Sequence, residues 1–366
     1  MLPDEARRRV NATKISPMKT ITEAVSHLER AETGVLLLCD PQDRLLGILT
    51  DGDVRRAILR GVKFDQPCGT IASVNPVVGR EDTTPTEALQ LMDRSRDFIV
   101  HQLPLVDAQN RVVGLVLRSD LVRDDGTEMA AVIMAGGYGT RLRPLTERVP
   151  KPMLPVGDRP LLERTIERLR DAGIRQVHVT THYLPDEIRR HFGDGKRFGV
   201  EMSYVSEDRP LGTAGGLSLM EDFDQPVLVV NGDIVTNVNF RDMLAFHRRH
   251  GADMTVGVRR YQVDVPYGVL QCDGALVHEV QEKPQVTLLI NAGLYLLEPS
   301  VRSCIPAGER FDMTDLMTRL LADGRTVASF PILEYWLDVG RPDDYARAQE
   351  DVKRAHGEDM KKVSGS

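Results

Sequence analysis

The chain has 366 residues, of which 41% are hydrophobic, and this length favours about two domains with apolar cores of their own. A formal net charge of −7 argues against a nucleic-acid partner, because nucleic-acid-binding surfaces need a basic face. No apolar run approaches the ~20 residues of a membrane span, and the N-terminus lacks the apolar core of a secretion signal. We therefore expect a cytoplasmic location and no membrane partner.

The first third of the chain repeats itself. Residues 38–47 return as residues 105–114, and Asp53 returns as Asp120, with a shift of 67 because 105 − 38 and 120 − 53 are equal. Each copy is predicted to run helix, strand, turn, strand, helix, since D-P-Q-D and D-A-Q-N between the apolar runs are turn sequences. The leading helices are predicted near residues 22–31 and 86–94.

The segment GILTDGD at residues 47–53 matches the pattern G-x-[LI]-T-x-x-D. With the repeat around it, the region at 9–125 resembles a tandem pair of CBS motifs, also called a Bateman module. The resemblance implies an α/β CBS pair in which Thr50 and Asp53 hold the phosphate and ribose of an adenine nucleotide.

The second copy keeps Asp120 as a candidate nucleotide ligand but has Leu117 in the place of the threonine. Asp53 and Asp120 are also suited to capping the helices that follow them. CBS pairs serve as dimer contacts as well, so nucleotide sensing and assembly into a homo-oligomer both remain open. We predict a regulatory module at residues 1–125, joined to the rest by a short polar linker.

Residues 131–155, AVIMAGGYGTRLRPLTERVPKPMLP, place a glycine turn directly after a short apolar strand. Glycines let backbone N–H groups approach an anion closely, because no Cβ intervenes. Arg141 and Lys151 follow and add charge-assisted contacts to phosphate oxygens. The segment predicts a nucleoside triphosphate cradle. Its spacing fits neither the P-loop nor the Rossmann G-x-G-x-x-G fingerprint.

Strands and helices then alternate along the chain, which predicts an α/β fold with a mostly parallel sheet. The predicted elements are a helix at 160–172, a strand at 176–181, a helix at 186–191 and strands at 200–205 and 226–230. Ligands of such sheets bind at the carboxyl ends of the strands. The glycine turn and the N-G-D at residues 231–233 both follow strands, so we expect them to converge.

Asp233 and Asp338 both follow apolar stretches. Two carboxylates that meet near phosphates are suited to Mg²⁺, which prefers oxygen ligands, although each aspartate is also suited to capping a turn. Lys283, in E-K-P after a predicted strand at 277–280, is a point charge for a phosphate or else an ordinary surface lysine.

Glu207 precedes the L-G-T-A-G-G at residues 211–216. A carboxylate accepts hydrogen bonds and cannot donate them, so it suits guanine, uracil or thymine better than adenine. The histidines at 178, 182 and 191 lack the spacing H-E-x-x-H and are predicted to be surface or packing residues. The four cysteines form no C-x-x-C pair, which argues against a zinc site.

Seven motifs follow one another in order: GGYGTRLRPLT, KPMLPVGDRPLLE, LGTAGG, NGD, EKP, NAG and WLDVG. This series resembles sugar-1-phosphate nucleotidyltransferases over residues 129–350. The resemblance implies a GT-A-like (Rossmann-like) α/β domain with a mixed, mostly parallel sheet at 129–352, followed by a polar tail at 353–366.

The resemblance further implies attack by a sugar 1-phosphate on the α-phosphorus of an NTP, giving an NDP-sugar and pyrophosphate with Mg²⁺ as cofactor. GTP is favoured over UTP and dTTP, because LGTAGG and the N-terminal motif are similar to those of mannose-1-phosphate guanylyltransferases. The implied catalytic residues are Arg141, Lys151, Asp233 and Lys283, and the metal ligands are Asp233 and Asp338. The implied nucleotide-binding residues are Ala135, Gly136, Gly137, Gly139, Thr140, Glu207, Gly212 and Thr213, and the sugar-phosphate residues are Glu282, Lys283, Asn291 and Gly293.

Two rival functions fit less well. A non-catalytic nucleotide-binding subunit would lack one of four charged residues that this chain keeps, namely Arg141, Lys151, Asp233 and Asp338. A glycosyltransferase would carry a D-x-D metal motif, whereas N-G-D lacks the first aspartate.

Overall fold

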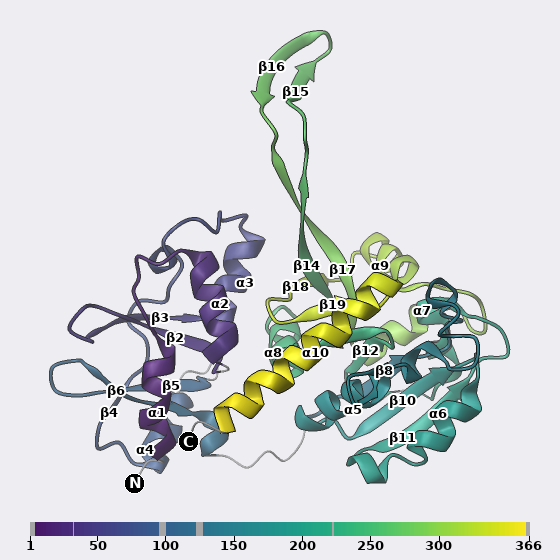
Figure 1. The fold of residues 1–366 in the computed structure, drawn as a ribbon, viewed down its shortest axis with the longest axis horizontal. Coiled ribbons are helices and arrows are strands. Elements are labelled where there is room, and N and C mark those ends of the chain that lie inside the picture. Colours follow the sequence, from purple (N-terminus) through teal and green to yellow (C-terminus); the bar gives the residue numbers. More distant parts are fainter. Residues whose placement is uncertain (1–3, 32, 95–99, 122–126, 222, 364–366) are drawn as a thin grey trace. The chain divides into compact units, whose positions relative to one another are not determined.

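In the computed structural model the chain forms two compact units, residues 1–125 and 126–366 (Figure 1). The structure describes residues 4–31, 33–94, 100–121, 127–221 and 223–363. Within these residues, no helix is both long enough and apolar enough to cross a membrane.

The first unit contains two small sheets of the same design, β1-β2-β3 and β4-β5-β6. In each sheet the first strand is parallel to the second, and the third is antiparallel to it. The helices and strands are α1 (Asp4–Thr13), β1 (Lys14–Ile15), α2 (Ile21–Ala31), β2 (Val35–Cys39), β3 (Leu45–Thr50), α3 (Asp51–Leu59), β4 (Gly79–Arg80), α4 (Pro85–Met92), β5 (Gln102–Val106) and β6 (Val112–Leu117). The strands β2 and β5 begin 67 residues apart, because 102 − 35 = 67, so the predicted repeat is confirmed in its strands. Where the first copy has α3, the second has the 3₁₀ helix Arg118–Asp120, and residues 122–126 lie outside the described residues.

Matching turns join the two copies. Asp43 and Asn110 both have φ of 62°, a left-handed conformation that short Asx side chains tolerate. Leu45 N donates to Asn110 O (2.9 Å), and Val112 N donates to Asp43 O (3.0 Å). The two copies therefore pair through their turns, and one apolar cluster contains buried side chains of both.

The second unit is built on a seven-stranded sheet of order β11-β10-β7-β12-β17-β14-β18. Every strand runs in one direction except β17, which is antiparallel to both of its neighbours, so the mixed, mostly parallel sheet is confirmed. The strands are β7 (Ala130–Met134), β10 (Gln176–Thr181), β11 (Glu201–Ser206), β12 (Val227–Asn231), β14 (Met254–Asp264), β17 (Gln285–Leu297) and β18 (Val327–Pro331).

Helices cover both faces of this sheet, because alternate residues of a strand point to opposite faces. Ala131 and Ile133 of β7 pack in a cluster with α5, α6 and α8, whereas Val132 packs in a second cluster with α7 and α9. The helices are α5 (Leu161–Asp171), α6 (Pro185–Phe192), α7 (Gly212–Gly215), α8 (Phe240–Arg249), α9 (Met313–Ala322) and α10 (Pro342–Val363). Residues 353–363, predicted as part of a tail, continue α10.

Three two-stranded ladders complete the unit: β8 (Pro155–Val156) with β9 (Arg159–Pro160), β13 (Ile234–Thr236) with β19 (Trp336–Asp338), and β15 (Val269–Asp273) with β16 (Leu276–Gln281). The strands β14 and β17 continue past the sheet and lead into β15 and β16. Residues 259–290, here called the arm, project from the unit as a long hairpin (Figure 1).

Candidate active site

The glycine turn lies at the carboxyl end of β7, where the parallel strands of the sheet end. Ala135 N donates to Thr180 O (3.0 Å) and keeps the start of the turn in line with β10. Gly139 has φ of +60°, and a Cβ there would lie 2.9 Å from Thr146 Cγ2, so the turn needs glycine at this position. Gly137 and Thr140 are exposed, which leaves this part of the predicted cradle open to a ligand.

Two positively charged residues that were predicted to contact phosphate, Arg141 and Lys151, follow the turn. Leu142 is buried and anchors the short 3₁₀ helix Thr140–Leu142, while Arg141 remains exposed. Lys151 is more enclosed, with 14% of its side chain exposed, and its Nζ lies 2.5 Å from Asp233 Oδ2. The structure thus joins the cationic segment to the end of β12.

A close approach between β7 and β12 places Asp233 beside this segment. Gly232 N donates to Met134 O (3.0 Å), and a Cβ at Gly232 would lie 2.7 Å from the same oxygen. The glycine between Asn231 and Asp233 is therefore what lets the two strand ends meet.

Asp338 approaches Asp233 from a different element. It ends β19, where it pairs with Ile234 of β13, and Val339 N donates to Asp233 O (2.9 Å). Loss of contact with water raises the pKa of the Asp338 carboxyl above its ordinary value, and the nearby Asp233 carboxylate raises it further. The positive charges of Lys151 and Arg141 lower this pKa and oppose both effects. Two carboxylates and two cations therefore share one electrostatic site.

The residues at this site fit a hard divalent cation. Such ions take oxygen ligands, and the side-chain Oδ1 of Asn231 is buried without a hydrogen-bond partner, two residues from Asp233. Across the described part of the chain, no group of three or more His, Cys, Asp and Glu side chains is placed to hold an ion. Two aspartates would thus leave ligand positions for water or substrate, as Mg²⁺ usually requires.

Glu207 follows β11 at the same edge and is buried. Its Oε2 accepts from Leu211 N (3.0 Å), and burial raises the pKa of its carboxyl. A Cβ on Gly216 would lie 2.7 Å from Oε1, and one on Gly136 would lie 3.7 Å from it. The carboxylate therefore lies between the glycine turn and the segment at residues 211–216.

Gly212 and Thr213 are tied to the N-terminus of α9. Thr213 N donates to Asp312 Oδ1 (2.9 Å), and Met313 N donates to Thr213 Oγ1 (2.8 Å). A Cβ on Gly212 would lie 2.5 Å from Asp312 Oδ1. The glycine is thus required by local packing, and the Thr213 hydroxyl already has a partner within the chain.

His182 belongs to this edge as well, although its sequence pattern pointed only to a surface or packing residue. Its Nδ1 donates to the carbonyl oxygen of Glu207 (2.7 Å), so Nε2 accepts from the hydroxyl of Tyr138 (2.9 Å). The pair connects the glycine turn to the Glu207 backbone. The available signal was position, because His182 directly follows β10 just as Glu207 follows β11.

Gly293 reaches the same edge from β17. It has φ of +69°, and a Cβ there would lie 2.5 Å from Asn231 Nδ2, so β17 passes close to the end of β12. The Asn291 side chain is engaged within its own strand. Its Nδ2 donates to the Tyr295 hydroxyl (2.9 Å), and its Oδ1 accepts from Gly293 N (3.0 Å).

Glu282 and Lys283 do not join these residues in this structure. Both are exposed and lie on the arm, just before β17. From Gln285 to Asn291 the extended strand alone covers about 20 Å, which is farther than a lysine side chain reaches. Motif order predicted these residues beside the site, but the continuous β14–β17 ladder carries them away from it.

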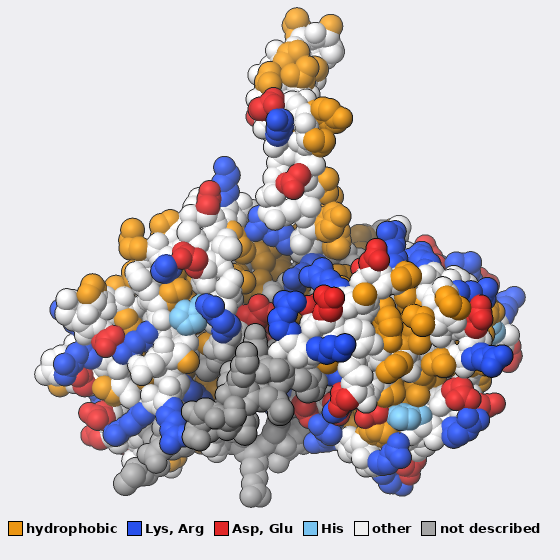
Figure 2. Space-filling view, viewed as in Figure 1, with side chains coloured by type: hydrophobic (Ala, Val, Ile, Leu, Met, Phe, Trp, Pro, Cys, Tyr) orange, Lys and Arg blue, Asp and Glu red, His pale blue; other side chains and the backbone are white. Residues whose placement is uncertain are grey.

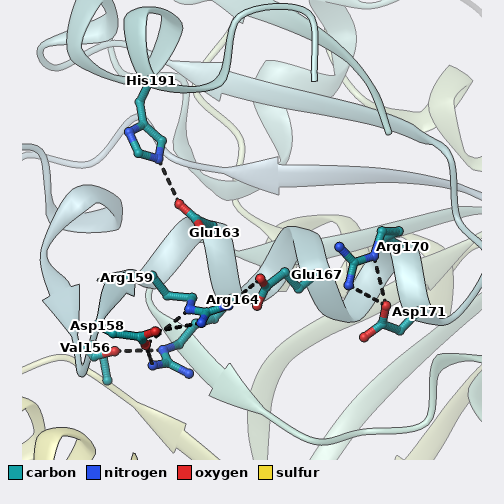
Figure 3. Close-up of polar contacts among 9 residues, drawn as sticks. All are labelled: Val156, Asp158, Arg159, Glu163, Arg164, Glu167, Arg170, Asp171 and His191. Carbon is teal, nitrogen blue, oxygen red and sulfur yellow. Dashed lines mark hydrogen bonds and ion pairs between the residues drawn. The ribbon is translucent and has the colours of Figure 1, made fainter. Parts of the chain in front are cut away.

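A polar network fastens the segment that connects Lys151 to α5 (Figure 3). Arg164 of α5 donates to Val156 O (2.7 Å) and to Asp158 Oδ1 (2.8 Å), while Arg159 bonds both Asp158 and Glu167. The hydrogen bond from Arg159 lowers the pKa of Asp158 to about 2. Exposed ion pairs stabilise little one by one, but together these fix the path of the connection.

In the first unit, Asp53 is buried and surrounded by donors. It accepts from Thr50 N (2.8 Å) and Thr50 Oγ1 (2.7 Å), and also from Ser73 Oγ (2.9 Å) and Arg56 (2.6 Å). Thr50 Oγ1 in turn accepts from Asp53 N, so the two residues form a capping box for α3.

Asp120 also has protein partners. It accepts from Leu117 N (3.0 Å) and from Arg9 of α1 (2.6 Å). Neither aspartate is the N-cap of a following helix, as considered from the sequence: Asp53 is the third residue of α3, and Asp120 is the last residue of the 3₁₀ helix Arg118–Asp120. Each carboxylate instead accepts from the backbone N–H three residues before it, and a regulatory nucleotide at these positions stays a prediction.

Comparisons with known proteins identify the families. The family model for nucleotidyl transferases matches residues 130–355, and that for the CBS domain matches residues 8–60 and 68–125. A mannose-1-phosphate guanylyltransferase of Mycobacterium tuberculosis is 35% identical over 236 residues, which cover 62% of this chain and 65% of that protein. A UTP–glucose-1-phosphate uridylyltransferase of Synechocystis is 34% identical over 241 residues, which cover 60% of this chain and 62% of that protein.

The chain thus spans less than two thirds of the length of these relatives. The crystal structure of a Bacillus anthracis protein assigned as a glucose-1-phosphate thymidylyltransferase aligns with a TM-score of 0.50 and 27% identity, covering 61% of this chain and 94% of that one. From the strand-end site and the match over residues 130–355, this chain belongs to the nucleotidyl transferase family, with two CBS domains ahead of the family's domain.

Proposed function

We propose that this chain transfers a nucleoside monophosphate from an NTP, with GTP favoured, to a sugar 1-phosphate and releases pyrophosphate. The observation that carries the proposal is the meeting of Lys151, Asp233 and Asp338 beside the glycine turn, within electrostatic reach of Arg141. Family membership supports the reaction class, and the relatives named for mannose and glucose 1-phosphates support the substrate class.

The reaction needs positioning and charge stabilisation more than acid–base chemistry, because the attacking phosphate oxygen is already an anion. That oxygen forms a bond to the α-phosphorus, the bond from the α-phosphorus to the bridging oxygen breaks, and pyrophosphate leaves with the electron pair. Arg141 binds the β- and γ-phosphates and stabilises the leaving group. Lys151 holds the reacting phosphates from its place beside Asp233.

A divalent cation, which we propose to be Mg²⁺, would be held by Asp233 and Asp338 and would supply positive charge to the phosphates. Loss of contact with water raises the pKa of Asp338, and the nearby Asp233 carboxylate raises it further, so a cation bound between the two carboxylates would offset their repulsion. Lys151 is the counter-ion that the chain itself provides to Asp233.

Glu207 is proposed to favour guanine. Its Oε2 is taken by Leu211 N, and within the described chain no hydrogen bond ends on Oε1, which lies between the glycine turn and Gly216. Guanine offers an N–H and an amino group to such an acceptor, whereas the corresponding edge of adenine offers an acceptor nitrogen. Uridylyl transfer is the second candidate, because uracil also offers an N–H and the Synechocystis relative is named for UTP.

The deciding experiment measures pyrophosphate release with Mg²⁺, using GTP, UTP, dTTP, CTP and ATP against a panel of sugar 1-phosphates. Release with one GTP and sugar pair supports the proposal, and a lower ratio of GTP to UTP turnover in Glu207→Gln assigns the base to Glu207. Silence across the panel in a folded protein, with and without AMP or ATP for the CBS pair, would contradict the proposed function.

A further inference from the structure

His182 lies at the end of the strand that separates the glycine turn from Glu207. In the sheet, β10 lies between β7 and β11. The glycine turn follows β7, Glu207 follows β11, and His182 follows β10. Because neighbouring strands lie about 4.8 Å apart, the ends of β7 and β11 are separated by roughly twice that distance. A side chain at the end of β10 is therefore placed to contact both segments.

Both ring nitrogens of His182 are used in these contacts. Nδ1 donates to the carbonyl oxygen of Glu207 (2.7 Å), so in the neutral imidazole Nε2 accepts from the hydroxyl of Tyr138 (2.9 Å). The backbone of His182 also lies close to the glycine turn, since a Cβ on Gly136 would lie 3.6 Å from His182 N. The imidazole thus spans from the glycine turn to the backbone of Glu207.

Tyr138 is held in place, although 44% of its surface is exposed. Its ring meets the His182 ring edge-on, with centroids 5.5 Å apart, and its centroid lies 5.4 Å from that of the Tyr183 ring. Tyr183 is fixed in turn, because its hydroxyl donates to Glu147 O (2.9 Å). The glycine turn is therefore fastened at Tyr138, and His182 connects this fastened point to Glu207.

We infer that His182 is a positioning residue that favours guanine by holding Glu207 in place, an inference that rests on the proposed function. Under that function the nucleobase meets the Glu207 carboxylate near Gly136 and Gly216. Guanine presents two donors side by side, whereas uracil presents one N–H between two carbonyl oxygens, so guanine depends more on how the carboxylate is oriented. His182 keeps the Glu207 backbone at a fixed distance from the glycine turn and thereby preserves that orientation.

The test measures the affinities of GTP and UTP by calorimetric titration, with Mg²⁺ and without a sugar 1-phosphate. His182→Ala removes both hydrogen bonds and is expected to lower the ratio of GTP to UTP affinity roughly three- to tenfold, the range that loss of a hydrogen bond produces. Tyr138→Phe removes only the bond to the glycine turn and should lower the ratio by a smaller factor. His182→Asn, whose amide nitrogen can replace Nδ1, should match Tyr138→Phe.

A double-variant cycle separates positioning from stability, because loss of packing alone lowers the melting temperature without changing the choice of base. In the Glu207→Gln background, His182→Ala should change the ratio of GTP to UTP affinity less than about twofold, since His182 acts through Glu207. An equal fall of the ratio in both backgrounds would show that His182 does not act through Glu207 and would overturn the inference.

Two further tyrosines provide matched controls, because each substitution also removes a single hydroxyl. Tyr183→Phe keeps its ring against Tyr138 but loses its bonds to the carbonyl oxygens of residues 146–147. Tyr267→Phe changes the arm, whose exposed hydrophobic side chains are visible in Figure 2. Both should keep the wild-type ratio. A fall in Tyr183→Phe equal to that in Tyr138→Phe would assign the effect to the ring cluster instead of His182.

The outcomes distinguish a failure of this inference from a failure of the proposed function. A wild-type chain that binds neither nucleotide, or that binds UTP more tightly than GTP, would contradict the proposed choice of base and this inference with it. A wild-type preference for GTP that survives unchanged in both His182→Ala and Tyr138→Phe would overturn this inference alone and leave the proposed function in place.

Discussion

Arg141 is exposed on a turn that the buried Leu142 anchors, so its removal takes away charge without opening a cavity. We expect Arg141→Ala to lower kcat by roughly two to three orders of magnitude, as loss of a charge-stabilising donor does elsewhere. Thermal unfolding should change little. Arg143→Ala is the control, since Arg143 is also exposed on the same turn. Near wild-type turnover in Arg141→Ala would remove this residue from catalysis.

Asp338, which we propose as a metal ligand, is expected to lower the stability of the folded chain at neutral pH. Because its pKa is raised in the folded chain, folding favours the protonated form, and stability is lost as the pH rises through that raised value. Asp338→Asn should therefore unfold at a higher temperature than wild type at pH 7, with the difference vanishing below pH 3.8. Added Mg²⁺ should stabilise wild type more than the variant. Calorimetry against pH and Mg²⁺ tests both, and equal melting temperatures at pH 7 would contradict the shift.

At the scale of elements, the glycine turn offers a matched pair of substitutions. Gly139→Ala places a Cβ 2.9 Å from Thr146 Cγ2 and 3.1 Å from Lys151 Cβ at a left-handed φ, whereas a Cβ at Gly137 meets nothing within 4 Å. Gly139→Ala should destabilise the unit by about 1–3 kcal/mol and weaken NTP binding, because the turn and Lys151 must shift. Gly137→Ala should resemble wild type in stability, as judged by urea unfolding. Equal effects of the two would show that the turn is not strained.

The capping boxes of α3 and α4 separate the two roles considered for Thr50. Thr50 and Thr84 cap their helices in the same way, each accepting from the backbone N–H three residues on. Alanine at either position should cost about 1 kcal/mol of stability. Only Thr50→Ala should also weaken adenine nucleotide binding, measured by calorimetric titration, if the first CBS copy holds a nucleotide. Identical binding by both variants would leave capping as the sole role of Thr50.

Much of the sheet could be predicted from the sequence, because buried parallel strands read as short continuous apolar runs. The predicted strands at 176–181 and 226–230 correspond to β10 and β12, and the rule that ligands bind at strand ends predicted that the glycine turn and Asp233 share one edge of the sheet. That Glu207 lies at the same edge was not predicted from this rule. Such strand patterns depend on residues that are adjacent in the sequence, so they can be recognised without knowledge of the rest of the structure.

The remainder depends on long-range geometry. Motif order placed Lys283 near the site, but only the register of β14 with β17 shows that the hairpin continues outward. The hydroxyl of Thr213 and the ring of His182 find their partners on segments far along the chain, at Met313 and Tyr138. The periodicity of the sequence contains no information about such pairings, so these hydrogen bonds could not be predicted.

At the scale of the whole molecule, the two units have separate cores, and we expect residues 126–366 to fold without the first 125. Deletion of residues 1–125 should leave a transferase with measurable pyrophosphate release but a changed response to adenine nucleotides. Steady-state rates with and without AMP or ATP, beside a thermal unfolding curve, test this. A folded but inactive truncation would show instead that both units form one catalytic body.

The turns at Asp43 and Asn110 relate the two CBS copies by matching backbone conformations. The side-chain contacts of the two copies nevertheless differ. Asp53 accepts hydrogen bonds from Ser73 and Arg56, whereas Asp120 accepts one from Arg9 of the N-terminal helix. The two copies thus share a backbone frame and differ in their side-chain contacts, so a substitution at one aspartate is not equivalent to the same substitution at the other. In one copy Thr50 and Asp53 cap α3, and in the other Asp120 binds Arg9 of the N-terminal helix α1.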